Sequence, residues 1–385
     1  MRNCSGPPVR GNDFFDRQRE QRQIWQALET DNLLLLAPRR VGKTSLLIRL
    51  AEVAPDQNFQ AVVISVADVP DESAFISKLY GEVRKLCGRK NLLSTLAESA
   101  MGAFLKKVKK AGGLGFTLEL DQKDTSHWAK IGKALTSFLN DLQGNWLLEI
   151  DEIPVFVLKI LKQEDGKARV ARFLYWLREL RQEQTRVRWV FAGSIGLDAI
   201  TARYHLGGTI NDLRLVSLGA FDAKTAHTFL EKLGESYQVS LSRPVRTYLL
   251  NKIGWTIPYY IQVFFAELRD DQLDHRDQPK KAAVDRVFEK LLSPSKKAYF
   301  DYWRQRLYEE LGSPESHRAV KLLNVIAKDE TGVSWDLLYQ ALSSEVSDPN
   351  SREAALRYLL NVLEGDGYLV QEENRFRFRM NLLRE

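Results

Sequence analysis

Cysteine and histidine are scarce in this sequence. The 385 residues include two cysteines, Cys4 and Cys87, which are too few for a disulfide-stapled scaffold or for a zinc site with four cysteine ligands. The histidines are scattered without the spacing of metal ligands, at His127, His205, His227, His275 and His317. We therefore predict no structural metal.

Long apolar runs are also lacking. No stretch approaches the roughly 18 apolar residues that span a bilayer, and no apolar segment follows a charged N-terminus. These absences predict a cytoplasmic protein without a membrane partner. With 44% hydrophobic and 28% charged residues, the composition is that of an ordinary globular chain. Its length suffices for about two to four domains.

Neither sign of charge is in large excess. The 56 basic and 50 acidic residues give a net charge of +6, which permits a nucleic-acid partner without requiring one. In the densest basic stretch, several arginines fall at helical spacing beside apolar residues, so a solvated helix face explains them without a ligand. These arginines are Arg169, Arg172, Arg178, Arg181, Arg186 and Arg188.

A phosphate-binding motif lies near the N-terminus. The apolar run 33–36 is followed by Ala37-Pro38-Arg39-Arg40-Val41-Gly42-Lys43-Thr44-Ser45 and then by a helix-like run. A strand, a tight loop and a helix N-terminus aim backbone N–H groups and a positive dipole end at one point, so residues 38–45 are expected to bind a nucleotide polyphosphate. Lys43 would reach the β and γ phosphates, and Thr44 would ligate Mg²⁺. Ala37 replaces the usual first glycine, which narrows the loop conformations available.

Two carboxylates end a second strand-like run. Asp151 and Glu152 follow residues 146–150. Because ligands bind beyond the carboxyl ends of parallel strands, Asp151 is expected to hold the Mg²⁺ ion through its water shell, and Glu152 to polarise the attacking water. Alone, the pair is compatible with an exposed acidic turn. Together with the phosphate loop, it predicts an ATPase with ATP and Mg²⁺ as cofactors.

A third strand-like run, residues 187–192, leads into Gly193 and Ser194. A polar side chain at that strand tip would lie near the γ phosphate, so Ser194 is expected to orient the attacking water and to report whether the phosphate is bound. The alternative is that the two residues start a turn or cap a helix at Ile195.

These motifs resemble those of the archaeal-type AAA+ ATPases of the origin-recognition and STAND lineage, and the resemblance spans most of the chain. The matching stretches are residues 37–46, 151–152, 193–197 and 254–260, together with residues 14–20, which resemble that family's nucleotide-base box. The resemblance implies a five-stranded parallel ATPase core, a helical lid and a C-terminal winged helix.

The resemblance also implies roles for single residues. Phe15 and Arg17 would lie near the adenine, and Pro258 would face the nucleotide at the position where many AAA+ proteins carry a sensor arginine. Rings of such ATPases complete their sites across subunits, which implies a homo-oligomer or a hetero-assembly. Arg203 and Arg214 are candidates for the trans-acting arginine, with an ordinary surface position as the alternative for each.

The order of elements predicts an α/β fold with three domains. Strand and helix signals alternate to about residue 220, which is typical of a parallel sheet, with strands at 33–36, 61–66, 146–150, 187–192 and 213–218. We predict an AAA+-like P-loop ATPase core over residues 1–220, a helical lid over 221–293 with a loop at 270–281, and a winged-helix domain over 294–385. Residues 106–124 interrupt the core as a basic insertion. They are interpreted either as a loop that contacts nucleic acid or a partner, or as a lysine-rich helix end capped by glycine.

The last strand of the winged helix carries alternating phenylalanines and arginines. Phe376 and Phe378 are expected to face the core, which places Arg375, Arg377 and Arg379 on the other face, where they suit the phosphates of duplex DNA. Two alternatives remain open. Outward charges protect an edge strand from aggregation, and winged helices also bind proteins.

Two classes of function follow. In the first, an ATP-hydrolysing AAA+ protein couples its nucleotide state to DNA. In the second, a nucleotide-gated regulatory protein or scaffold with slow or no turnover holds a protein partner, for example in a defence or signalling assembly.

Overall fold

The computed structural model describes residues 1–87, 125–193 and 196–385. The basic insertion predicted at residues 106–124 and the proposed water-orienting Ser194 lie outside the described residues.

A five-stranded parallel sheet forms the centre of the N-terminal part. The strand order is β2-β3-β4-β1-β5, with all neighbours parallel. The strands are β1 (Asn32–Leu36), β2 (Phe59–Ser65), β3 (Asn145–Asp151), β4 (Val187–Gly193) and β5 (Leu213–Ser217). The five strands predicted from the sequence are confirmed, with ends that differ by up to two residues. Their near-continuous apolar runs suit a sheet that is covered on both faces.

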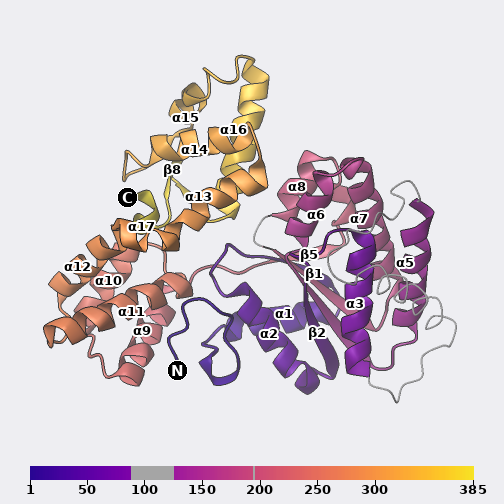
Figure 1. Ribbon diagram of the computed structural model, residues 1–385, viewed down its shortest axis with the longest axis horizontal. Coiled ribbons are helices and arrows are strands. Elements are labelled where there is room, and N and C mark those ends of the chain that lie inside the picture. The colour runs from indigo at the N-terminus through magenta and orange to yellow at the C-terminus, as the bar shows by residue number, and fades with distance from the viewer. Residues whose placement is uncertain (88–124, 194–195) are drawn as a thin grey trace.

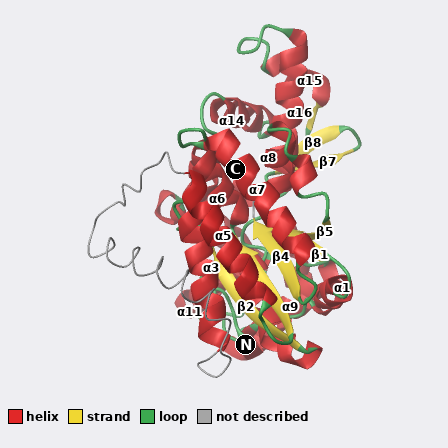
Figure 2. Ribbon diagram, turned by 90° about the vertical axis from the view of Figure 1, so that its right-hand side faces the viewer, coloured by secondary structure: helices red, strands yellow, loops and turns green. Residues whose placement is uncertain are grey.

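Helices cover the two faces of this sheet. The helices α1 (Gln18–Leu28) and α2 (Lys43–Val53) pack on the face that carries Leu33 and Leu35. The other face, which carries Leu34, is covered by α3 (Glu72–Cys87), α5 (Thr125–Asn140), α6 (Ile153–Leu161), α7 (Gly166–Glu183) and α8 (Leu197–Arg203), most of which Figure 2 shows around the strands. Short 3-10 turns lie at η1 (Gly11–Asp13), η2 (Ala54–Gln57) and η3 (Gly207–Thr209).

Four helices follow the last strand of the sheet. They are α9 (Ala223–Tyr237), α10 (Arg243–Ile253), α11 (Pro258–His275) and α12 (Lys281–Leu292), followed by the turn η4 (Pro294–Lys296). This set, called the lid below, was predicted from helical spacing. The predicted loop at 270–281 is wrong over its first half, because α11 continues to His275. The polar composition of this stretch suggested a loop. In the structure, Arg286 of α12 donates two hydrogen bonds to the carboxylate of Asp271, which stabilises the end of α11 as a helix.

The C-terminal part has the element order of a winged helix. It consists of α13 (Ala298–Leu311), α14 (Glu315–Ile326), β6 (Val333–Ser334), α15 (Trp335–Ala341), α16 (Pro349–Gly365), β7 (Leu369–Glu372), β8 (Arg375–Phe378) and α17 (Asn381–Arg384). The strands form an antiparallel sheet in the order β6-β8-β7. Phe376 and Phe378 are buried, which confirms the predicted alternation along β8.

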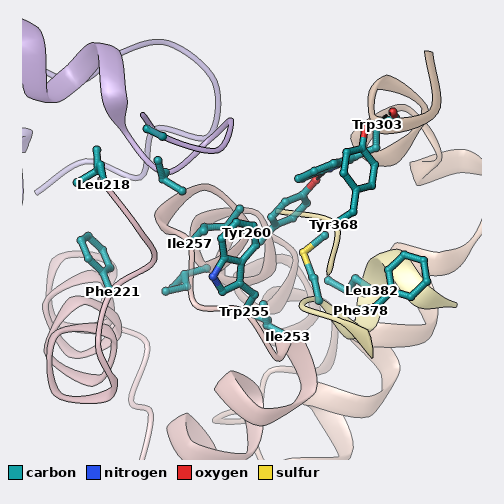
Figure 3. Packing of buried hydrophobic residues seen from close by; sticks show 14 of the residues in the cluster. Leu218, Phe221, Ile253, Trp255, Ile257, Tyr260, Trp303, Tyr368, Phe378 and Leu382 are labelled. Atoms are coloured by element: carbon teal, nitrogen blue, oxygen red, sulfur yellow. Dashed lines mark hydrogen bonds between the residues drawn. The ribbon is translucent and has the colours of Figure 1, made fainter. Parts of the chain in front are cut away.

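The three parts share one hydrophobic cluster. It runs from the α1/α2 face of the sheet through the lid into the winged helix. Figure 1 shows the lid beside the sheet and the winged helix above the lid, and Figure 3 shows lid residues Trp255 and Tyr260 packed near Trp303 and Tyr368 of the winged helix. The predicted fold class, an α/β P-loop core on a parallel sheet with a helical lid and a C-terminal winged helix, is confirmed.

None of the helices in the described ranges combines the length and apolar character that crossing a bilayer requires.

Candidate functional site

The phosphate loop connects β1 to α2 at the carboxyl edge of the sheet. Gly42 is the N-cap of α2 with a φ of 97°, and Arg40 also has a positive φ of 67°. Ala37 is buried, its φ is not positive, and its backbone N–H donates to the carbonyl of Gly193 at 3.3 Å. The alanine is therefore tolerated, because the left-handed conformations of this loop fall at residues 40 and 42 rather than at 37.

Four predicted site residues meet where α2 begins and β3 ends. Lys43 Nζ lies 2.6 Å from Asp151 Oδ1 and 2.8 Å from Glu152 Oε1. The Thr44 hydroxyl donates to Asp151 Oδ2 at 2.8 Å. Glu152 is the N-cap of α6 with a φ of 64°, a left-handed conformation that turns the chain sharply out of the strand. The structure thus brings together side chains that are 107 to 109 residues apart in the sequence.

The donor set suits a small hard cation. Mg²⁺ prefers oxygen ligands and is usually held by one or two protein oxygens together with phosphates and water. The hydroxyl of Thr44 and the carboxylate of Asp151 supply such oxygens side by side next to the phosphate loop. These two residues therefore fit the predicted Mg²⁺ site.

The charges around Glu152 keep it ionised. Burial alone would raise the pKa of Glu152, but Lys43, Arg39 and Arg306 together lower the pKa below its ordinary value. Glu149, earlier in the same strand β3, behaves in the opposite way. It is fully buried, its two carboxyl oxygens have no hydrogen-bond partner, and burial followed by the charge of Asp151 raises its pKa well above the ordinary value. The pKa values of the two glutamates therefore shift in opposite directions.

A cavity of 420 Å³ lies over the phosphate loop. It is walled by the N-terminal segment, the loop, the tip of β3 and the lid. The predicted nucleotide-binding residues that line it are Phe15, Arg17, Pro38, Arg39, Arg40, Val41, Gly42, Lys43, Thr44, Ser45 and Pro258, and Glu152 lines it as well. Asp151 is buried beneath the cavity rather than in its wall.

Aromatic rings and a buried arginine form part of the cavity wall. Phe15 packs against Phe221 and Phe229 with ring centroids 5.9 and 5.0 Å apart. The guanidinium of Arg17 donates to the carbonyls of Val41 at 3.2 Å and Gly219 at 2.7 Å. Arg17 therefore ties the phosphate loop to the chain that follows β5, a bracing contact that the resemblance to a base-binding box did not predict.

The lid contributes no positive charge to the described wall of the cavity. Its lining residues there are Phe221, Phe229, Pro258, Tyr259 and Gln262. The phosphate loop instead extends an arginine, Arg40, toward the lid. Its guanidinium lies 4.0 Å from the Tyr259 ring centroid and donates to the Tyr260 hydroxyl at 3.3 Å and to the carbonyl of Tyr299 at 2.8 Å. The sequence placed Arg40 among the phosphate-binding residues but gave no sign of these contacts.

The two candidates for a trans-acting arginine differ in their surroundings. Arg214 lies on the edge strand β5, largely exposed, 3.3 Å from Asp31. Arg203, at the end of α8, donates to Glu315 of α14 at 2.6 Å and to the Tyr358 hydroxyl of α16 at 3.1 Å. Arg203 is exposed, as the surface alternative expects, and its two contacts lie between the sheet-containing part and the winged helix.

The wing arginines all have partners within the chain. Arg375 donates to the carbonyl of Gly332 at 2.9 Å, and Arg377 donates to both carboxylate oxygens of Glu372 at 2.9 and 2.7 Å. Arg379 donates to the carbonyl of Leu369 at 2.6 Å. Any phosphate contact by these side chains competes with those interactions.

Comparisons with known proteins bear on the fold. No protein-family model matches the chain, and no curated protein matches it. Among solved structures, the Walker-type ATPase PABY2304 of Pyrococcus abyssi is 22% identical, with 99% of this chain and 98% of that chain covered and a TM-score of 0.61. The ORC2 protein of Aeropyrum pernix, in its ADPNP-ADP complexes, is 14% identical, with 96% and 92% covered and a TM-score of 0.53. The predicted resemblance to archaeal-type AAA+ ATPases of the origin-recognition lineage is thus confirmed at the level of the fold.

Proposed function

We propose that this protein binds ATP with Mg²⁺, hydrolyses it, and uses the nucleotide state to control how the lid and winged helix engage DNA or a partner. The observation that carries the proposal is the meeting of Lys43, Thr44, Asp151 and Glu152 beside a cavity lined by the phosphate loop. Both solved structures that support the fold are named for ATPase activity or for bound adenine nucleotides.

Each residue has a distinct task in this proposal. The loop N–H groups and the N-terminus of α2 bind the phosphates, and Lys43 leaves its two carboxylates to contact the β and γ phosphates. Thr44 and Asp151 hold Mg²⁺, which neutralises charge on the phosphates when it is bound. Glu152 accepts a proton from the attacking water. Ser194, the residue after Gly193 in the sequence, is proposed on sequence grounds to orient that water.

Lys43→Ala is expected to weaken ATP binding in the presence of Mg²⁺ at least about tenfold, because hydrogen bonds from charged groups contribute roughly 1.5–3 kcal/mol. Isothermal titration with ATP and Mg²⁺ measures the change. The matched control is Lys78→Ala, which removes a partly exposed lysine paired with Asp68 and should leave ATP affinity unchanged. Equal ATP affinity for wild type and Lys43→Ala would show that the cavity binds its ligand in some other way.

The partner of the winged helix separates the two classes of function. If it is duplex DNA held by the wing, changing Arg375, Arg377 and Arg379 to Ala should weaken DNA binding and lower its salt dependence. The slope of log K against log salt should fall by about 0.9 for each phosphate that the wing no longer neutralises. Fluorescence anisotropy at several salt concentrations measures both. Changing Arg19 and Arg22, which are exposed on α1, to Ala provides a control that removes two positive charges away from the wing. DNA binding that survives the triple change unaltered would place the DNA contact elsewhere.

The second candidate is a nucleotide switch with slow or no turnover and a protein-binding winged helix. It is favoured by the docked position of α16, whose Tyr358 is held by Arg203 of the ATPase core. A partner that binds α16 must therefore displace a contact to the core. A homo-oligomer or hetero-assembly is proposed in both cases, on the basis of the AAA+ resemblance.

A further inference from the structure

The side chain of Arg40 joins the phosphate loop to both other parts of the chain. Its guanidinium lies 4.0 Å from the ring centroid of Tyr259, at the start of lid helix α11, and donates to the carbonyl of Tyr299, at the start of α13, at 2.8 Å. Arg40 and Tyr259 both line the cavity over the phosphate loop. The contact that ties the loop to the lid and winged helix is therefore made at the border of the cavity itself.

The hydroxyl of Tyr260 completes this junction. It accepts hydrogen bonds from Arg40 at 3.3 Å and from the indole N–H of Trp303 at 2.5 Å, and it donates to the carbonyl of Tyr299 at 3.3 Å. A hydroxyl has one donor and two acceptor positions, so all of them are used here. The Tyr260 ring is fully buried and stacks on Phe300 of α13 with centroids 5.7 Å apart. The lid and α13 are therefore bonded to each other where they meet Arg40.

The winged helix also touches the phosphate loop close to Arg40 in the sequence. Gly367, in the turn after α16, has a φ of 87°, and a Cβ atom there would collide with the Trp255 ring of the lid and lie 3.1 Å from Cβ of Pro38. Pro38 is two residues before Arg40 in the loop. A movement of the phosphate loop therefore changes contacts with the lid and with the winged helix at the same time.

A bound polyphosphate competes for the guanidinium of Arg40. Its acceptors on the lid and α13 are a hydroxyl and a carbonyl, both neutral. Phosphate oxygens carry negative charge and accept two parallel hydrogen bonds from a guanidinium, so they are stronger acceptors than either neutral group. The backbone of Arg40 has a positive φ of 67°, which is disfavoured for a residue with a side chain, so its present conformation depends on the contacts around it.

We propose that Arg40 exchanges between two sets of partners, the lid and winged helix or the nucleotide phosphates, so that phosphate binding and docking of the winged helix oppose each other. The inference rests on the proposed function, because it requires a nucleotide polyphosphate in the cavity, but it does not require hydrolysis. Binding and docking are then linked by one free energy. A change that weakens docking therefore strengthens nucleotide binding.

The test weakens docking at a position outside the cavity wall. Glu315 of α14 pairs with Arg203 of α8 at 2.6 Å, and neither residue lines the cavity. Glu315→Arg places two positive charges opposite each other and should weaken docking, whereas the double variant with Arg203→Glu restores an ion pair of reversed sign. Isothermal titration with ATP and Mg²⁺ measures the Kd of each protein, first with Arg40 present and then in an Arg40→Met background. Arg40→Gln serves as a second neutral background if the methionine disturbs the loop.

Docking is followed independently as the distance between labels on cysteines placed at Tyr175 of α7 and Leu337 of α15. Both positions are exposed. The native Cys4 and Cys87 are changed to Ser in the labelled proteins, whose ATP affinity is checked against wild type. The distance is measured without nucleotide and at saturating ATP with Mg²⁺.

Glu315→Arg is expected to lower the Kd for ATP about fivefold or more, as for an ordinary coupling between two sites, and to increase the label distance. The double reversal should return both quantities toward their wild-type values. In the Arg40→Met background, the label distance should already be increased without nucleotide, and Glu315→Arg should change the Kd little. Saturating ATP should increase the label distance of the chain that retains Arg40 and leave that of Arg40→Met unchanged.

The outcomes separate this inference from the proposed function. If ATP binds but leaves the label distance unchanged, or if Glu315→Arg increases that distance without lowering the Kd, the inference alone is overturned. An equal gain in affinity with and without Arg40 also overturns it, because the coupling would then pass through other residues. If no protein binds ATP, the proposed function and the inference both fail. The expected gain in affinity without any turnover supports the inference and contradicts only the proposed hydrolysis.

Discussion

Glu152→Gln is expected to bind ATP about as well as wild type and to lower kcat at least about 100-fold, because a positioned general base contributes roughly 10²–10⁴-fold. The amide keeps the shape of the carboxylate but does not accept a proton from water. Lys43 keeps its contact with Asp151 Oδ1 at 2.6 Å, so the phosphate loop retains its neighbour. Phosphate release measures kcat, and titration with ATP and Mg²⁺ measures affinity.

Glu149→Gln is the matched control for this substitution. Glu149 lies in the same strand, also buried, and its pKa is raised well above the ordinary value by burial and by Asp151. An amide there keeps the size of the side chain and replaces a carboxyl group whose charged form is disfavoured by burial, so kcat should change little. If Glu152→Gln turned over ATP at the wild-type rate, the base would have to lie elsewhere and the assignment of Glu152 would be wrong.

The sequence predicted best the features that are local in the chain. Short runs of residue types were enough to predict the loop between β1 and α2, the acidic pair at the tip of β3 and the order of strands and helices. Parallel strands bring their carboxyl ends to one edge, so Lys43 and Asp151 were expected to meet although they are 108 residues apart. The parallel arrangement of the strands was therefore enough to predict that long-range contact, and the packing of side chains was not needed.

Contacts between the separate parts were not predictable in this way. Even within the winged helix, Arg306 of α13 and Asp366, the C-cap of α16, are 60 residues apart, and the spacing of those helices indicates only that each has an apolar face. Nothing in the sequence indicates how the winged helix docks on the core. The sequence also does not distinguish an arginine that becomes buried from one that stays exposed to solvent. The contacts of Arg40 and Arg203 to the lid and winged helix were missed for the same reason.

Arg181 is the clearest error of this kind. The arginines around it predicted a solvated face of α7, but its side chain is 2% exposed. It donates to both carboxylate oxygens of Asp212 at 2.9 and 2.8 Å and to the carbonyl of Thr209 at 2.9 Å. Its guanidinium also lies 5.2 Å from the Phe191 ring centroid. Helical spacing placed Arg181 correctly on its helix, but the segment before β5 that covers this face comes 28 residues later.

Arg181→Met is therefore expected to lower the free energy of unfolding by about 3 kcal/mol, because removing one partner of a buried ion pair leaves the other charge uncompensated. Asp212 retains some access to water, which places the expected loss at the lower end of the usual range. Urea denaturation followed by tryptophan fluorescence measures it, since Trp189 lies in the neighbouring strand β4.

Two further variants show whether the loss of the Arg181–Asp212 ion pair is the cause of the lower stability. Arg172→Met removes an exposed arginine from the same helix and should change stability by less than about 0.5 kcal/mol. Arg181→Met combined with Asp212→Asn should cost less than the sum of the single changes, because the second substitution removes the charge that the first left without a partner. Additive losses would show that Arg181 stabilises the protein through its packing on Phe191 and its bond to Thr209 instead, and the pair with Asp212 would then contribute little.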